Sequence, residues 1–391
     1  MLVLRPDYFE QFSCVAGDCL ESCCINWKID VDKLSFHKYR EVKGEFGKYL
    51  NDRVVRDRKN GTDSDYAIIK LDENRRCSFL NDNNLCEIYI NIGEKYLCNT
   101  CKQYPRYIYK YGDRYEITLT ISCPEVARLI LLREEPITFN MTEEEVPPAN
   151  VKEQEYEEAL HDILWDVRSL LIDIAQYRNI PTWKRMVFIK QVMDKVMQAV
   201  VDGTYSSNLL GVLISYVENE KSAAILEKAH TNRAGKRKLI ESILQYRMDV
   251  GIDNINFNNR VEDVMTFFKN IDQLEQIDSL EMEYEEYIKE KDYILENYMV
   301  YYIYANLLTT LWTGDTIKEI DLLIFNYVSI KYMLFIEWLN KKKELQPEDF
   351  INVIYSFSRG MEHNFGYKDG IYEALKENDM TQIEDLVNLL A

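Results

Sequence analysis

The chain has 391 residues, of which 47% are hydrophobic and 29% are charged, and it contains only 14 glycines and 8 prolines. These proportions are typical of a folded globular protein and exclude a disordered or low-complexity chain. The formal net charge of −19 argues against a nucleic-acid partner, because an acidic surface repels phosphate groups.

The charge is unevenly distributed along the chain. Residues 1–123 contain 19 basic and 19 acidic side chains, so the whole net charge of −19 falls on residues 124–391. An acidic surface of this kind either attracts a basic partner or simply keeps the protein soluble. Charge alone leaves both interpretations open.

Neither the N-terminal residues nor the most apolar stretches of the chain predict a targeting or membrane segment. The first residues, MLVLRPDYFEQF, lack a basic region followed by an apolar run, so we expect no secretory signal. The most apolar stretch, Tyr298–Trp312, is shorter than the roughly 20 residues of a membrane span, and Ile320–Leu339 is interrupted by charged side chains. We expect buried core helices, no transmembrane segment and a cytoplasmic protein.

The N-terminal third is predicted to form short strands and turns. Tyr66–Leu71 is a strand candidate, and Cys77–Leu80 with Leu85–Tyr89 is predicted to form a hairpin. A second hairpin is predicted for Tyr107–Tyr111 and Tyr115–Ser122, since Gly-Asp supplies the turn between alternating residues.

The end of this region and the rest of the chain are predicted to be helical. A helix is expected from Pro124 to Leu132, followed by a Glu- and Pro-rich linker over Glu134–Asn150. Apolar residues then recur at helical spacing. The expected helices span 160–174, 181–203, 209–217, 236–248, 284–312, 317–339, 347–358, 369–376 and 381–390.

The fold class is therefore predicted to be mainly α. A small cysteine-rich α+β module is expected over residues 1–133, and an acidic all-helical domain over residues 151–391.

All nine cysteines lie between Cys14 and Cys123, and none occurs in the following 268 residues. Disulfides are disfavoured because the number of cysteines is odd and because we expect no export signal. Buried structural cysteine explains one or two thiols, but not a set confined to one third of the chain. A metal centre is the favoured interpretation, with an iron–sulfur cluster preferred and zinc as the alternative.

The cysteine spacing, together with the motifs around it, resembles a known family. Trp27 and Asp30 follow the first cysteines, and Ser-Cys-Pro-Glu surrounds the last one at 122–125. Further along, Glu-Asn-Tyr at 296–298 and Ser-Arg-Gly-Met-Glu-His-Asn at 358–364 complete the pattern. The chain resembles the flagellin lysine-N-methylase family, whose N-terminal part is similar to a widespread zinc- or iron-chelating domain.

The resemblance implies an enzyme that transfers methyl groups from S-adenosylmethionine to lysine side chains of flagellin. It also implies an iron–sulfur cluster, which we expect to be of the four-iron type. Cys98 matches no position expected to be cysteine. The implied metal ligands are Cys14, Cys19, Cys23, Cys24, Cys77, Cys86, Cys101 and Cys123.

Candidate catalytic and binding residues come from the two C-terminal motifs. Glu296, Tyr298, Glu362 and His363 are the catalytic candidates, and Asn297, Arg359 and Asn364 are the candidates for substrate or methyl-donor binding. Residues three and four apart share one helix face, which favours a polar site. The alternative is that these side chains satisfy helix ends and packing.

Methyl transfer to lysine needs a neutral amine, which desolvation or a nearby base supplies. Aromatic and carboxylate walls suit the lysine cation before it loses its proton. Tyrosines at 104, 107, 109 and 111 and at 298, 301, 302 and 304 offer such walls, although most tyrosines are expected to be ordinary core residues.

Two function classes follow from these observations. The first is the flagellin lysine methyltransferase. The alternative is a non-catalytic scaffold or redox protein that binds zinc or an iron–sulfur cluster. No glycine-rich strand–turn–helix is present, so a Rossmann-type site for the methyl donor is not predicted.

Overall fold

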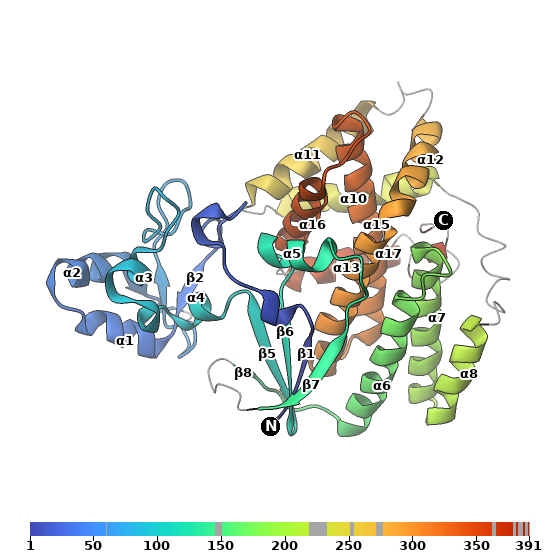
Figure 1. Ribbon diagram of the computed structural model, residues 1–391, viewed down its shortest axis with the longest axis horizontal. Coiled ribbons are helices and arrows are strands. Elements are labelled where there is room, and N and C mark those ends of the chain that lie inside the picture. The colour runs from blue at the N-terminus through green and yellow to red at the C-terminus, as the bar shows by residue number, and fades with distance from the viewer. Residues whose placement is uncertain are drawn as a thin grey trace. The chain divides into compact units, whose positions relative to one another are not determined.

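The computed structural model describes residues 1–59, 61–144, 151–218, 233–250, 254–270, 277–361 and 365–377, together with positions 381, 386, 387 and 390. The chain divides into two compact units. The first contains Met1–Leu129 and Thr138–Glu153, and the second contains Ile130–Ile137 and Gln154–Ala391 (Figure 1). The predicted domain ranges of 1–133 and 151–391 stay predictions.

The first unit contains a five-stranded sheet with strand order β7-β1-β6-β5-β8. The predicted hairpin is confirmed as β5 and β6, which turn at Gly112, where φ is +60°. Such a backbone conformation favours glycine, because other residues carry a Cβ that clashes there. The strands are β1 (Leu2–Pro6), β5 (Arg106–Tyr111), β6 (Arg114–Leu119), β7 (Phe139–Glu143) and β8 (Val151–Lys152).

A second sheet of the same unit has strand order β2-β4-β3, formed by Ile29–Val31, Ala67–Ile69 and Val54–Arg56 respectively. The strand predicted at Tyr66–Leu71 is confirmed as β4. Two helices lie between β2 and β3, namely α1 (Lys33–Glu41) and α2 (Gly44–Arg53). The Asp32 side chain caps α1 by accepting a hydrogen bond from the Ser35 amide.

Two predictions for this region are wrong. The expected hairpin of 77–80 with 85–89 is reduced to isolated bridges, because the chain enters helix α3 (Glu87–Ile92) directly after Cys86. The expected linker of 134–150 contains strand β7, which pairs antiparallel with β1. Local patterns miss this strand because its partner lies at the other end of the unit.

The helix predicted after Cys123 is confirmed as α5 (Pro124–Leu131), and the short helix α4 (Asn99–Gln103) precedes the hairpin. The first residue of α5 is Pro124, and its missing amide hydrogen costs no hydrogen bond at the start of a helix. Residues 130 and 131 of α5 belong to the second unit.

The second unit is built from helices, which confirms the mainly α fold. Helices α6, α7 and α8 run side by side (Figure 1). The bounds are α6 (Glu158–Ala175), α7 (Thr182–Val201), α8 (Ser207–Glu218), α10 (Arg233–Val250), α11 (Ile255–Asn270), α12 (Ile277–Ile288), α13 (Asp292–Asn306), α14 (Thr310–Thr313), α15 (Thr316–Asn340), α16 (Pro347–Met361) and α17 (Phe365–Glu377).

The single long helix predicted at 284–312 is wrong. It is divided into α12, α13 and α14 by one-turn 3₁₀ segments at Lys289–Lys291 and Leu307–Thr309. Helix α11 was not predicted, since its few buried residues, such as Phe257 and Val261, are separated by polar ones. Most of the helix predicted at 381–390 lies outside the described residues.

Helix α15 lies at the centre of the second unit. It packs against α7, α11, α13 and α16, and 18 of its 25 residues are buried. By length and composition, Thr316–Asn340 is the one described helix that would be able to cross a bilayer, and 83% of its apolar window is buried inside the protein. This burial is typical of a core helix of a folded domain.

Candidate functional site

The nine cysteines all lie in the first unit, and five of them pack on one hydrophobic core. Cys77 and Cys98 are fully buried in that core, and Cys24, Cys86 and Cys101 pack against it. The loops and short helices of the second sheet position these thiols, since Cys86 precedes α3 and Cys98 precedes α4.

Burial and, to a smaller extent, the other thiols raise the pKa of these cysteines. Burial raises the pKa of Cys77 to about 12, and the thiols of Cys86, Cys98 and Cys23 raise it further. Burial is also the main reason why the pKa of Cys86 is raised. A thiol in such surroundings stays protonated unless a cation stabilises the thiolate.

Cys123 belongs to the same neighbourhood. Burial raises the pKa of Cys123 to about 12, with additional contributions from Cys19 and Cys23. Cys23 contributes to the raised pKa of both Cys77 and Cys123, although burial is the main cause in each case.

Cys98, which the resemblance left out, lies beside a predicted ligand. A hydrogen bond between the two thiols lowers the pKa of Cys98 and raises that of Cys101. The Cys98 thiol also donates to the carbonyl oxygen of Asp30, at 3.5 Å. This hydrogen bond is typical of a structural cysteine. In the sequence, the Cys-x2-Cys spacing of Cys98 and Cys101 indicated that these two thiols lie close together.

The donor set fits a soft metal by its chemistry, because several sulfur ligands share one partly dry region. Among the described residues, however, no three His, Cys, Asp or Glu side chains converge closely enough to hold a metal ion. A bound cluster would therefore require the thiol-bearing loops to draw together. The assignment of Cys14, Cys19, Cys23, Cys24, Cys77, Cys86, Cys101 and Cys123 as ligands stays a prediction.

In the second unit, Glu296 on α13 forms the centre of a buried ion-pair network. Its side chain is 1% exposed, and both carboxylate oxygens accept hydrogen bonds from Arg178, at 2.9–3.1 Å. Arg185 of α7 donates to the same carboxylate at 2.7 Å and is itself 3% exposed. A buried carboxylate needs such partners, because an unpaired charge there is strongly unfavourable.

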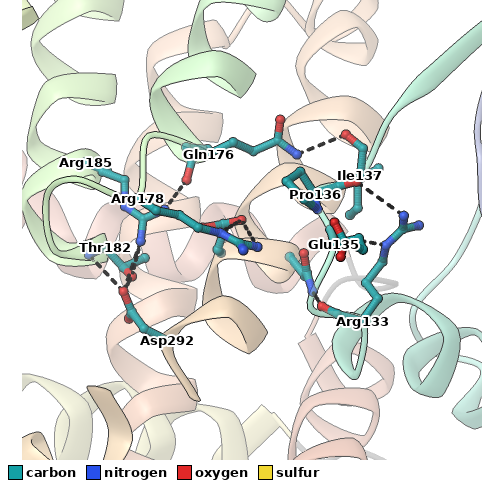
Figure 2. Close-up of polar contacts among 12 residues, drawn as sticks. Arg133, Glu135, Pro136, Ile137, Gln176, Arg178, Thr182, Arg185 and Asp292 are labelled. Atoms are coloured by element: carbon teal, nitrogen blue, oxygen red, sulfur yellow. Dashed lines mark hydrogen bonds and ion pairs between the residues drawn. The ribbon is translucent and has the colours of Figure 1, made fainter. Parts of the chain in front are cut away.

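The network continues from Arg185 to the start of α13. Arg185 donates to Asp292 at 3.0 Å and to the Thr182 hydroxyl at 2.9 Å (Figure 2). Thr182 also donates to Asp292 from its hydroxyl and its amide. The turn between α6 and α7 is thereby fixed to α13.

Asn297, the next residue, holds a different segment. Its amide group donates to the carbonyl oxygens of Arg133, at 2.8 Å, and Leu131, at 3.4 Å. Gln176 at the end of α6 donates to the carbonyl of Ile137, at 2.9 Å, and Figure 2 shows its side chain reaching toward that segment. Segment 130–137 is thus attached to the helices by side-chain amides.

The remaining candidates are only partly described. Tyr298 is fully buried, with its ring 6.0 Å from that of Tyr302. Arg359 is 8% exposed and its guanidinium lies 5.5 Å from the Tyr355 ring. Glu362, His363 and Asn364 lie outside the described residues. Every catalytic and binding assignment made from the sequence stays a prediction.

A small cavity lies between α10, α12 and α15. Its volume is about 40 Å³, which is room for about three water molecules. The lining residues are Lys236, Glu281, Tyr284, Glu285, Val328, Lys331, Tyr332 and Phe335.

A second buried ion pair joins α7 to α15. Lys190 contacts Asp321 at 3.0 Å, and Asp321 is 1% exposed. Burial raises the pKa of Asp321 from 3.8 to about 6, although Lys190 acts in the opposite direction. Burial acts to lower the pKa of Lys190, but Asp321 and Asp194 raise it on balance.

This pair predicts a pH dependence of stability. Because the folded state binds the Asp321 proton more tightly than the unfolded state, the free energy of unfolding should fall as pH rises from about 4 to 6. A shift of about two pKa units corresponds to about 3 kcal/mol. Denaturant titrations at pH 4 and pH 7 measure this effect. Between these pH values, the free energy of unfolding of the wild type should fall by about 3 kcal/mol more than that of Asp321→Asn.

An exposed carboxylate provides the control for this experiment. Glu290 lies on the surface of the same unit. The difference in free energy of unfolding between the wild type and Glu290→Gln should stay constant over the same pH range. An equally constant difference for Asp321→Asn would contradict a raised Asp321 pKa.

Comparison with known proteins supports a lysine methyltransferase over a non-catalytic scaffold. Residues 168–389 match the family model of the FliB lysine N-methylase C-terminal domain. The chain belongs to the FliB lysine N-methylase family. The predicted family and the prediction of a protein-lysine N-methyltransferase are thereby confirmed.

Individual relatives extend this similarity to the N-terminal unit. Proteins named Lysine-N-methylase from Salmonella choleraesuis (strain SC-B67) and Salmonella typhimurium (strain LT2) are each 22% identical, over 93% of this chain and 92% of their own length. A protein named Flagellar biosynthetic protein FliU from Salmonella muenchen is 32% identical, over 33% of this chain and 76% of its own length. No solved structure matches the chain.

The matched FliB domain contains the three network residues that the sequence interpretation missed. Arg178, Arg185 and Asp292 were not candidates, yet they bind Glu296 or its partner. The signal was indirect: a glutamate inside an apolar helix requires a cation nearby, and only the fold shows which arginines provide it.

Proposed function

We propose that the protein methylates lysine side chains of flagellin, with S-adenosylmethionine as the methyl donor and an iron–sulfur cluster in its N-terminal unit. The observation that carries this proposal is the FliB lysine N-methylase match over residues 168–389. The flagellar name of the FliU relative supports flagellin as the substrate. We expect the reaction to take place in the cytoplasm.

The proposed reaction is a direct transfer of a methyl group. The neutral lysine nitrogen forms a bond to the methyl carbon while the carbon–sulfur bond of the donor breaks. The electron pair of that bond goes to sulfur, which yields S-adenosylhomocysteine, and the nitrogen then loses a proton. No oxidant or reductant is needed.

The amine must lose one proton before this transfer, because an ammonium has no free electron pair. Glu362, His363, Glu296 and Tyr298 were predicted to serve the reaction, and Asn297, Arg359 and Asn364 to bind its substrates. The Glu296 carboxylate is already engaged in the ion-pair network, because both of its oxygens accept hydrogen bonds from arginine. We propose that Glu296 positions α13 while Glu362 or His363 handles the proton.

The metal part of the proposal depends on the thiol neighbourhood. When bound, an iron–sulfur cluster would stabilise the thiolates and crosslink the loops of the first unit. Zinc is the alternative occupant with the same ligand chemistry. Iron and sulfide analysis after anaerobic purification distinguishes the two metals.

The proposed activity is tested by incubating anaerobically purified protein with flagellin and isotopically labelled S-adenosylmethionine. The expected result is label on flagellin, with mass increases of one or more methyl groups located on lysine residues. Flagellin with acetylated lysines is the matched control and should remain unlabelled. If flagellin stays unlabelled while other lysine-containing proteins become labelled, the substrate assignment fails but the lysine methyltransferase remains.

A further inference from the structure

Two tyrosines on β5 present their rings side by side on one face of the first unit's sheet. Tyr107 and Tyr109 are two residues apart in a strand, so their side chains point to the same face. Their ring centroids are 6.3 Å apart and the ring planes differ by only 17°. They form a continuous aromatic surface.

A lysine from the neighbouring strand lies over these rings. Lys152 of β8 is the register partner of Tyr109 in a parallel pairing. Its ammonium nitrogen is 4.5 Å from the Tyr107 centroid and 5.6 Å from the Tyr109 centroid. Both distances lie within the range of roughly 6 Å over which a ring attracts a cation.

The aromatic contacts of Lys152 are not accompanied by an ion pair. Among the described residues, no carboxylate lies within ion-pair distance of its ammonium, whereas the nearby Lys110 contacts Glu153 at 2.7 Å. Desolvation lowers the pKa of the Lys152 ammonium, although part of the side chain is exposed.

The same sheet face also has polar groups suited to an incoming ligand. Thr118 is the register partner of Tyr107, is 3% exposed, and has no hydrogen-bond partner for its hydroxyl among the described residues. Glu116, opposite Tyr109, is also 3% exposed. Burial is the main cause of the raised pKa of Tyr109, and Tyr107 and Glu116 raise it further. A nearby negative charge favours a cation on the rings.

We propose that Tyr107 and Tyr109 form a binding site for the ammonium group of a substrate lysine, and that Lys152 occupies this site until the substrate displaces it. The inference rests on the proposed function, since it names the chemical group that the methyltransferase recognises. Lys152 would then act as an internal competitor. When an internal competitor fills the site, only the remaining fraction of molecules can bind the substrate. The apparent affinity for the substrate is the intrinsic affinity multiplied by that free fraction.

The test is a binding measurement without methyl donor. The probe is a fluorescently labelled peptide with one lysine flanked by glycines, and its partner peptide carries norleucine in place of lysine. Lys152→Ala should bind the lysine peptide about tenfold more tightly than the wild type, as expected when the site is filled for about nine tenths of the time. Lys110→Ala, which removes a neighbouring lysine with its own carboxylate partner, should bind like the wild type.

Further variants locate the effect on the rings. In the Lys152→Ala background, replacing Tyr107 and Tyr109 by leucine should abolish the gain, whereas replacing both by phenylalanine should keep most of it. Denaturant titration checks that the leucine variant is folded. Equal or weaker binding by Lys152→Ala, or equal binding of the norleucine peptide, would overturn the site.

The outcomes separate this site from the proposed activity. If Lys152→Ala gains affinity for the lysine peptide but flagellin is not methylated, the lysine site stands and the proposed function fails. If flagellin is methylated but Lys152→Ala binds the peptide no better than the wild type, the site assignment fails and the proposed function stands.

Discussion

Replacing Glu296 by glutamine is expected to lower the free energy of unfolding of the helical unit by about 3 kcal/mol or more, since removal of one partner from a buried ion pair leaves the other charge uncompensated. Arg185 is 3% exposed and cannot move its charge into water, and Asp292 alone would remain as its acidic partner. Arg178, at 42% exposed, can turn toward solvent. Denaturant unfolding followed by far-ultraviolet circular dichroism measures the loss.

An exposed ion pair of the same unit provides the matched control. Glu286 and Lys289 are both mostly exposed, so Glu286→Gln should change stability by less than about 0.5 kcal/mol. The experiment also tests the catalytic role predicted for Glu296. A Glu296→Gln variant that unfolds at the wild-type denaturant concentration, yet no longer transfers methyl groups, would show that the carboxylate is catalytic rather than structural.

Elements defined by local patterns could be predicted from the sequence. The β5–β6 hairpin follows from alternating side chains and a Gly-Asp turn, and α5 follows from a proline at its first position. Strands β1 and β7 were missed because their pairing joins the N-terminus to residues near 140. The break between α12 and α13 was missed because one turn of 3₁₀ helix has nearly the same periodicity as an α-helix.

The candidate sites were predictable in composition but not in arrangement. The sequence identified Glu296 and Asn297 as unusual polar residues on an apolar helix, yet their contacts lie more than 100 residues away in the chain. Contacts of this kind depend on helix packing, which periodicity does not encode. The Tyr107–Tyr109 pair was visible as a motif, but only strand pairing shows that Lys152 fills it.

Loss of iron on substitution of Cys86 is the second large effect that we expect. Cys86 packs against the core that holds Cys77 and Cys98, and its thiol interacts with both Cys98 and Cys23. Removal of a metal ligand should reduce iron binding by about tenfold or more, because changes around the ligands alone weaken metal binding by 10–100-fold. Iron and sulfide per chain, measured after anaerobic purification, test this expectation.

Cys98→Ser is the matched comparison, because this residue is as deeply buried as any ligand candidate but does not fit the family's cysteine pattern. Its thiol donates to the carbonyl of Asp30, and a serine hydroxyl can make the same hydrogen bond. We therefore expect Cys98→Ser to keep most of its iron. If it loses as much iron as Cys86→Ser, then Cys98 and Cys101 act together as a ligand pair. If the wild type instead contained stoichiometric zinc and no iron, the proposed iron–sulfur cluster would be wrong and the cysteines would form a zinc site.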